Sequence, residues 1–505
     1  MVREVLTHSP VLCGLAANPA LPVGLLDRFV TVADPELCLD LADRDDLTPA
    51  QTRRLAACGG VDTVIRLVRR RLLPITDLDT PDPGVVLALL DEAEAPEPWA
   101  RALYAHPDPA VRAELAAAAH VPAEVLSDLS DDHEVEVVAA VAGSARLTGA
   151  LARRLAGHPH LSVRRSVAGN ERTPRPVLTA LTADAGNPPA RWCCGCDGRA
   201  APPAWMRCAG GDHESARIDL AYALVTNPAT PGDAVAGYAE HPTAYVRWAL
   251  AERPDLPRHS YAMLAADPAP AVRAAVAENQ AIDELLIRSL AGDDTPEVRR
   301  RLAHNPAIPL DVLARIAPIT KIGSTLLPRI AAAHPDEIPT LARSPVPELR
   351  MMLAERQDLP PAVVNLLAED PDAKVLKSLT RNSRLTDEQL RAIVTRHGVR
   401  VVAAVARNPS CSPQLLHDLA AHNPPVQKAL RAIAAHPNAD AAALLQCLPD
   451  RQARPIAARH PALPAAAITQ LLHDPDERVV EAAAANPSLP RPAMECLINA
   501  EPDAG

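Results

Sequence analysis

Residues 296–316 read PEVRRRLAHNPAIPLDVLARI, and this stretch contains the unit from which the rest of the chain is built. Val298 and Leu302 stand four positions apart, which places both side chains on one face of a helix. The motif Asn305-Pro306-Ala307-Ile308-Pro309 follows, and after it comes an apolar pair spaced by three. The stretch therefore predicts two short helices joined by a proline-containing turn.

The Asn-Pro-x-(Leu/Ile/Thr)-Pro motif recurs along the whole sequence in exact or degenerate form. We call its first residue the anchor, and successive anchors are mostly 26 residues apart, with gaps as short as 22 and as long as 30. The anchors stand at positions 18, 44, 70, 92, 118, 144, 170, 197, 227, 253, 279, 305, 334, 356, 382, 408, 436, 460 and 486.

Apolar columns accompany each anchor. Positions +8 and +11 carry pairs such as Leu26 and Phe29, and a pair spaced by four precedes each anchor, such as Val272 and Val276. One two-helix unit cannot bury its apolar face alone, whereas a stack of units can. The sequence thus predicts an all-α solenoid of about nineteen two-helix repeats of about 26 residues.

Helix starts are predicted from the prolines. Five residues before the first valine of each pair stands Asp, Ser or His followed by proline, as in Asp267-Pro268 and His241-Pro242. An Asp N-cap with proline in the first turn is typical of a helix start. The proline four residues after each anchor, for example Pro309, is expected in the first turn of the next helix.

Together, the anchor motif, the leucine pairs and the Asp-Pro-x-x-Val-Arg segments resemble the variant leucine-rich repeat family over about residues 10–500. The copies are weakest at 30–105 and 317–345. The resemblance implies a HEAT-like, right-handed superhelix of alternating α and 3₁₀ helices that serves as a binding scaffold and catalyses no reaction. One continuous solenoid is expected, with repeats over 1–185, a Cys-rich junction over 186–226, repeats over 227–500 and a tail over 501–505.

Residues 186–213 interrupt the pattern and concentrate thiols. Cys194 and Cys208 align with core columns, and Asp197 aligns with the anchor. Several thiolates that converge beside a glycine-bearing turn suit a soft metal ion. The candidate ligands are Cys193, Cys194, Cys196, Cys208 and His213.

Two metal sites fit these residues, and the sequence leaves the choice open. Cys193-x-x-Cys196 with Cys208 and His213 would make a Cys₃His zinc site, whereas the four cysteines would hold a [4Fe–4S] cluster. Variant leucine-rich repeat proteins can carry a four-cysteine cluster at the N-terminal end, whereas this group lies in mid-chain. The competing interpretation is a set of core or redox-active thiols, because Cys447 occupies the same +11 column with no cluster near it.

An arginine column follows the first valine of each pair. A line of arginines could contact phosphates, as in HEAT-like DNA-repair proteins, or pair with acids of adjacent repeats such as Asp267, Asp293 and Asp370. The formal net charge of −11 favours the structural ladder and makes nucleic acid an unlikely partner. The column consists of Arg112, Arg164, Arg191, Arg247, Arg273, Arg299 and Arg350.

Composition narrows the function further. Of the 505 residues, 48% are hydrophobic but only 2% are aromatic, and 53 are proline. No apolar run approaches the roughly 18 residues of a membrane span, and neither a signal peptide nor a P-loop, dinucleotide or hydrolase motif is recognisable. Ten cysteines are too few for a secreted disulfide scaffold, so the cytoplasm is expected.

These observations predict a non-enzymatic interaction scaffold with a zinc or iron–sulfur structural site and an unidentified protein partner on the concave face. The alternatives are a redox- or metal-responsive sensor that uses a [4Fe–4S] cluster, and a HEAT-like nucleic-acid-binding protein that uses the arginine column.

Overall fold

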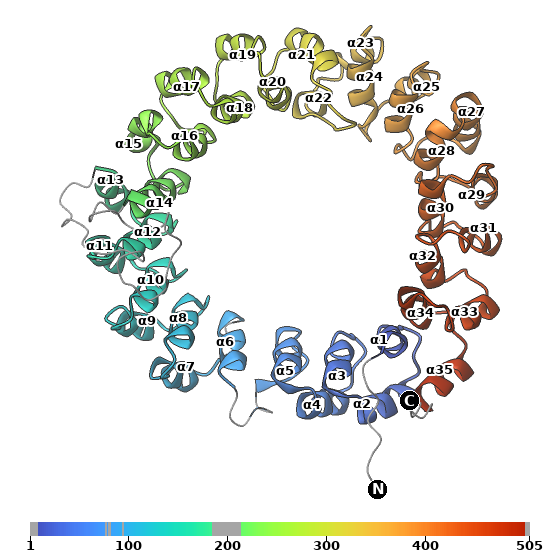
Figure 1. The fold of residues 1–505 in the computed structure, drawn as a ribbon, viewed down its shortest axis with the longest axis horizontal. Coiled ribbons are helices and arrows are strands. Elements are labelled where there is room, and N and C mark those ends of the chain that lie inside the picture. The colour runs from blue at the N-terminus through green and yellow to red at the C-terminus, as the bar shows by residue number, and fades with distance from the viewer. Residues whose placement is uncertain (1–8, 76–77, 79–81, 93–94, 184–213, 500–505) are drawn as a thin grey trace. The chain divides into compact units, whose positions relative to one another are not determined.

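The computed structural model describes residues 9–75, 78, 82–92, 95–183 and 214–499, and these residues fold into many short helices (Figure 1). No strand is present among them, and the longest helix, α14 (Glu214–Thr226), has 13 residues. The chain divides into two compact units. Unit 1 contains residues 1–79, 323–326 and 330–505, and unit 2 contains residues 80–322 and 327–329.

Unit 2 consists of two rows of helices that alternate along the chain. Even-numbered helices from α6 to α20 form the inner row, on the inside of the curve that the unit follows in Figure 1, and odd-numbered helices form the outer row. Its elements are α6 (Pro83–Asp91), α7 (Glu97–Tyr104), α8 (Pro109–Ala117), α9 (Ala123–Leu129), α10 (Val135–Gly143), α11 (Gly149–Ala156), α12 (Leu161–Gly169), α13 (Arg175–Ala183), α14, α15 (Gly232–Val235), η3 (Ala236–Glu240), α16 (Ala244–Ala251), α17 (Arg258–Ala265), α18 (Pro270–Glu278), α19 (Glu284–Leu290), α20 (Pro296–Ala303), α21 (Leu310–Ile316) and η4 (Ala317–Ile319).

Unit 1 has the same two rows but draws on both ends of the chain. Its inner row runs through α24, α26, α28, α30, α32, α34, α1, α3 and α5. Its elements are α1 (Pro10–Ala16), α2 (Val23–Val32), α3 (Pro35–Leu41), α4 (Pro49–Cys58), α5 (Gly60–Arg69), α23 (Ile338–Ala342), α24 (Pro347–Ala354), α25 (Pro361–Ala368), α26 (Ala373–Leu379), α27 (Asp387–His397), α28 (Val399–Val405), α29 (Pro413–Ala420), α30 (Gln427–Ala434), α31 (Ala441–Cys447), α32 (Arg454–Arg459), α33 (Ala465–Leu471), α34 (Glu477–Ala484) and α35 (Arg491–Asn499); α22 (Pro328–Ala331) contains the boundary with unit 2.

The predicted apolar columns form the core of each unit. Leu26 and Phe29 are fully buried, and so are Val272 and Val276. Leucine and valine dominate because thin helices in two rows leave little room for aromatic rings. The described helices of both rows are mainly α-helical, and η3 and η4 have 3₁₀ geometry, so the regular α/3₁₀ alternation implied by the family resemblance is not seen in these residues.

The predicted helix starts are wrong by a few residues. α18 begins at Pro270 with Ala269 as its N-cap, so Asp267 lies outside the helix and instead accepts a hydrogen bond from the Ala269 amide at 2.8 Å. His241 does the same for the Thr243 amide at 3.1 Å. These side chains therefore fix the turn before the helix. Pro309 is the N-cap of α21 and does not lie in its first turn.

The anchor side chains connect neighbouring inner-row helices by a repeated set of hydrogen bonds. Asn305, which is fully buried, donates from Nδ2 to the carbonyls of Ala277 at 3.0 Å and Asn279 at 2.8 Å. Its Oδ1 accepts from the Ala307 amide at 2.9 Å. The acceptors lie 28 and 26 residues earlier in the sequence, so the predicted spacing corresponds to one step of this hydrogen-bonded column.

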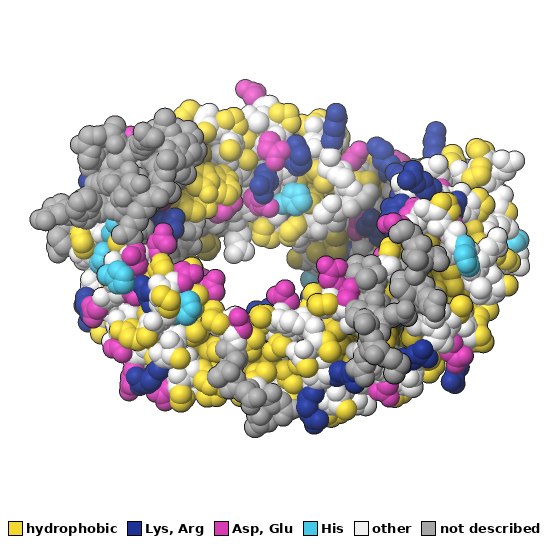
Figure 2. Space-filling model, turned by 60° about the horizontal axis from the view of Figure 1, so that its bottom comes forward, with side chains coloured by type: hydrophobic (Ala, Val, Ile, Leu, Met, Phe, Trp, Pro, Cys, Tyr) yellow, Lys and Arg dark blue, Asp and Glu magenta, His cyan; other side chains and the backbone are white. Residues whose placement is uncertain are grey.

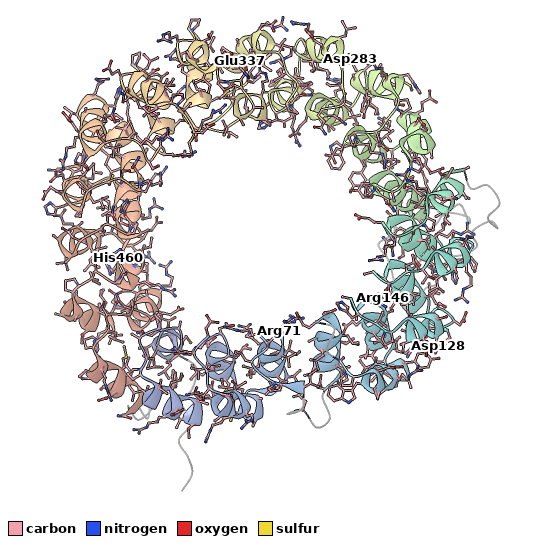
Figure 3. All side chains as sticks on the ribbon, turned by 180° about the vertical axis from the view of Figure 1, so that it is seen from behind. Arg71, Asp128, Arg146, Asp283, Glu337 and His460 are labelled. Carbon is pink, nitrogen blue, oxygen red and sulfur yellow. The ribbon has the colours of Figure 1, made fainter. Side chains whose placement is uncertain are left out.

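The anchor column tolerates larger side chains where they reach the same carbonyls. Arg253 donates from Nη1 to Val225 at 2.8 Å and Asn227 at 2.9 Å. At His460, which Figure 3 labels, Nε2 lies 3.1 Å from the carbonyl oxygen of His436. The full two-carbonyl pattern is made by Asn18, Arg44, Asn170, Asn227, Arg253, Asn279, Asn305, Asn408 and Asn486.

The hydrogen bonds of Asn227 change the predicted order of the anchors. Asn227 donates to the carbonyls of Ala168 at 2.6 Å and Asn170 at 3.0 Å, and α14 packs directly on α12. The anchors at 170 and 227 are therefore neighbours, and the anchor predicted at Asp197 is not a step between them. The intervening residues 184–213 lie outside the described residues.

The two ends of the chain stack on each other within unit 1. Asn18 donates from Nδ2 to the carbonyls of Ala484 and Asn486, both at 2.8 Å, which is the bond pattern of consecutive anchors although the residues are 466 and 468 positions apart. α1 packs on α34, and a Cβ on Gly14 would lie 2.1 Å from the Glu481 carbonyl oxygen. Glycine is therefore required at this close contact.

Candidate binding surface on the inner row

The arginine column forms a ladder of ion pairs, as predicted for Asp267, Asp293 and Asp370. Arg273 lies with Nε 2.7 Å from Asp293 Oδ2, and it also donates from Nη1 to the Asp267 carbonyl at 2.8 Å. Each arginine thus joins a carboxylate 20 residues later to a carbonyl six residues earlier. The ion pairs are Arg112–Asp132, Arg247–Asp267, Arg273–Asp293, Arg350–Asp370 and, in addition to the predicted column, Arg454–Asp474.

These pairs are shielded from solvent and hold the carboxylates ionised. The hydrogen bonds from Arg273 lower the pKa of Asp293 below its usual range, against the opposing effect of burial. Side chains fixed in this way have few donors left for an external ligand. Arg164 donates from Nε to His158 O at 2.7 Å, and the buried Nε of Arg299 has no hydrogen-bond partner. Arg191 lies outside the described residues.

The ladder is absent from three adjacent helices of unit 1, as it is from other inner helices such as α1, α6 and α10, where Leu12, Val86 and Val138 hold the equivalent position. The residues six positions before anchors 382, 408 and 436 are Leu376, Val402 and Leu430, which lie on α26, α28 and α30 and are buried. Apolar side chains there pack into the core in place of the arginine pairs. These three helices therefore stack without the ladder.

The same three helices carry a different set of cations, which we call the basic strip. Lys374, Arg400 and Lys428 all stand eight positions before an anchor, and all three are exposed. Three of the four lysines in the sequence belong to the strip. Its members are Lys374, Lys377, Arg400, Arg407, Lys428 and Arg431. In Figure 2, dark-blue side chains gather at the right of the view, where this part of unit 1 lies.

Two grooves are lined by the basic strip. One, of about 550 Å³, lies along α24, α26 and α28, and its lining includes Lys374, Lys377, Arg400, Asp372 and the ladder residue Arg350. The second, of about 650 Å³, lies along α30. Its lining residues are Arg407, Pro409, Lys428, Arg431, Ala432, Ala435, His436 and Pro437, which include three strip cations and no carboxylate.

The strip cations have no ion-pair partners among the described residues. Arg431 donates from Nε to the Gln427 carbonyl at 3.4 Å, and the strip makes no pair with a carboxylate in this part of the chain. The nearest comparison is Arg478, which also stands eight positions before an anchor but pairs with Asp476 at 2.8 Å. That guanidinium lowers the pKa of Asp476 to about 2. Unpaired cations therefore distinguish the strip.

Unit 2 presents different side chains at the equivalent inner-row positions. Eight positions before its anchors stand acidic, small or aromatic residues, among them Glu136 on α10, Ala271 on α18 and Glu297 on α20. On α16 the residue is Tyr245, 52% exposed, whose ring stacks on that of Tyr222 with centroids 4.5 Å apart. No cation occupies this position in the described helices of unit 2.

The predicted metal ligands Cys193, Cys194, Cys196, Cys208 and His213 lie outside the described residues. The zinc or [4Fe–4S] site therefore stays a prediction, although Asp197 no longer supports its placement by repeat alignment. Within the described ranges, no group of three or more His, Cys, Asp or Glu side chains is arranged to hold a metal ion. Cys447 is buried as the competing interpretation expected, and burial raises the pKa of its thiol to about 12.

The sequence analysis missed the basic strip. Its signal was the recurrence of Lys374, Arg400 and Lys428 at one offset from the anchor, which differs by two positions from the arginine column. The arginine column has more members and is therefore the stronger periodic signal.

Comparisons with known proteins add little to this geometry. No protein-family model and no curated protein matches the chain. Among solved structures, the chain is similar to the crystal structure of an engineered protein, with 14% identity over 95% of this chain and 98% of that chain and a TM-score of 0.11. At that TM-score the likeness carries no argument.

The structural class of the protein follows from its fold. The described chain is all-helical, with many short helices in local contact, which is consistent with a helical-repeat solenoid. In the ranges that could be searched, no helix has the length and apolar character needed to cross a membrane. The resemblance to variant leucine-rich repeats remains a prediction.

Proposed function

We propose that the protein is a non-enzymatic scaffold that binds a partner protein on the inner row of unit 1. The proposal includes the finer architecture, a right-handed α-solenoid of about 26-residue repeats related to the variant leucine-rich repeat family. The observation that carries it is the basic strip, because Lys374 and its equivalents are exposed while the anchors and buried apolar side chains such as Val402 hold these helices together. Charged residues that packing does not require are the usual means by which a scaffold selects partners.

The nucleic-acid alternative has less support. The arginines that it would use, such as Arg247 and Arg350, are paired with aspartates at 2.6 and 2.7 Å. Phosphate contacts would have to break these pairs, and the net charge of −11 opposes a long polyanion.

Site-specific crosslinking tests the scaffold proposal. A photo-crosslinkable residue in place of Ala403, on inner helix α28, should capture one discrete partner in cells. The same residue in place of Asn365, on outer helix α25, is the matched control. The captured protein must then bind the purified full chain in a defined ratio. Equal capture from both positions, or no binding of the purified partner, would reject the proposal.

The redox-sensor alternative depends entirely on the cysteine group, so its test is chemical. Protein purified without oxygen should contain iron and absorb visible light if the cluster forms, and a Cys194→Ser/Cys208→Ser variant should lose both. One zinc per chain would instead support a structural site. A chain with neither metal would remove both metal predictions and leave the scaffold proposal intact.

A further inference from the structure

We propose that the basic strip binds an acidic segment of a partner protein, with about six to eight residues in extended conformation. This inference rests on the proposed scaffold function and names the chemistry of its partner. It depends on three features of unit 1: the unpaired charges, the length of the strip and the change of charge on either side of it.

The strip cations can bind a ligand because the packing of α26, α28 and α30 does not depend on them. At Leu376, Val402 and Leu430 the helices pack through apolar side chains, and the anchors Asn408 and His436 join them. Like charges that recur on three adjacent helices repel one another. A negatively charged ligand offsets that repulsion, because it is attracted electrostatically to all of these cations together.

The length of the strip fits a short segment. Neighbouring helices pack about 8–10 Å apart, so three of them span about 20 Å between their axes. An extended chain advances about 3.3 Å per residue, so about six residues cover that distance. Lys374, Arg400 and Lys428 offer one cation per helix, and a carboxylate at every second or third residue would meet them.

The charge of the inner row changes on both sides of the strip. On the α24 side, the position equivalent to Lys374 is Glu348. On the other side, the groove at α32 and α34 has mixed charge, because Arg451, Arg454 and Arg478 line it together with Asp474, Asp476 and Glu477. A long polyanion such as duplex DNA would continue past Lys374 onto Glu348 and be repelled there, whereas a short acidic peptide ends before it.

Peptide binding to the full-length protein tests the proposal. The probe is a fluorescein-labelled Glu₈ peptide, followed by fluorescence anisotropy at low and at physiological salt, with Gln₈ and a (dT)₂₀ oligonucleotide for comparison. We expect Glu₈ to bind, Gln₈ not to bind, and a Lys374→Glu/Arg400→Glu/Lys428→Glu variant to lose at least about tenfold in affinity.

A matched variant controls for net charge. Arg258→Glu/Arg315→Glu/Arg343→Glu changes the same number of exposed cations, all at or beside outer-row helices, and should change the affinity less than about twofold. Circular dichroism confirms that both variants are folded. If the strip variant does not fold, Lys374→Ala and Lys428→Ala, tested separately, should each reduce the affinity by a few-fold.

Three outcomes would overturn the inference: no binding of Glu₈ to the wild-type chain, equal losses in the two triple variants, or tighter strip-dependent binding of (dT)₂₀ than of Glu₈. None of them would by itself reject the scaffold proposal, because crosslinking from position 403 detects a partner of any charge. If crosslinking also fails, the scaffold function fails with it.

Discussion

Helices α16–α20 of unit 2 and helices α26–α30 of unit 1 are held together by the same anchor column and expose opposite chemistry. In unit 2, Asn279 and Asn305 bond the preceding carbonyls and Arg273 pairs with Asp293. In unit 1, Asn408 makes the same anchor bonds, but the ladder is absent and cations cover the inner row. The difference teaches that the anchor is the invariant part of the architecture, whereas the ladder and the exposed charges can be exchanged.

The first prediction tests the anchor hydrogen bonds that the two regions share. Asn305→Ala in unit 2 and Asn408→Ala in unit 1 each remove two hydrogen bonds to buried carbonyls and leave those acceptors unsatisfied. Each should lower the free energy of unfolding by about 3 kcal/mol, measured by urea denaturation. Substitutions of the adjacent residues, half-buried His304→Ala and exposed Arg407→Ala, are the controls. A much smaller loss at Asn408 than at Asn305 would mean that the two regions are not built alike.

The second prediction extends the comparison to the contact between the chain ends. Gly14→Ala places a methyl group 2.1 Å from the Glu481 carbonyl oxygen, so α1 and α34 must separate. We expect a loss of about 2 kcal/mol, typical of overpacking, and faster hydrogen exchange in both helices. Gly24→Ala is the control, because nothing lies within 4 Å of the added Cβ. Equal effects of the two substitutions would exclude a stack between the ends.

The short helices and their buried apolar columns were predictable from the sequence, because the anchor motif and the apolar pairs recur along it. The contact between α1 and α34 was not predictable, since the carbonyls that Asn18 binds lie 466 and 468 positions away in the sequence and no local pattern pairs them. The prediction of an anchor at Asp197, between those at 170 and 227, has a similar cause. Periodicity alone does not reveal that Asn227 reaches back to Asn170.

The third prediction concerns the ladder. Arg273→Leu copies the apolar side chain found at Leu376, but it leaves the Asp293 carboxylate, whose side chain is only 10% exposed, without its partner. We expect a loss of about 1.5 kcal/mol at pH 7. The pKa of Asp293 is lowered in the folded protein, so the pair contributes fully above the carboxyl's ordinary pKa of about 3.9 and is lost as the pH falls through its folded-state pKa.

Urea midpoints measured from pH 7 to pH 3 test whether the stabilisation by the Arg273–Asp293 pair is lost in acid. The difference between wild type and Arg273→Leu should shrink in acid, because protonated Asp293 no longer needs the guanidinium. A difference that stays constant over this range would show that the arginine stabilises the helices by packing and not by charge. The double variant Arg273→Leu/Asp293→Leu should recover part of the stability lost at pH 7, since no buried carboxylate then remains unpaired.

The smallest expected effect concerns the basic strip itself. Lys374→Ala, Arg400→Ala and Lys428→Ala should each change the free energy of unfolding by less than about 0.5 kcal/mol, because exposed, unpaired side chains contribute little to stability. Removing like charges can even stabilise the fold slightly at low salt. Lost affinity for Glu₈ together with unchanged urea midpoints would separate binding from folding at single residues. A loss of stability as large as that of Arg273→Leu would instead make these cations structural, and the contrast between the two regions would no longer concern a ligand.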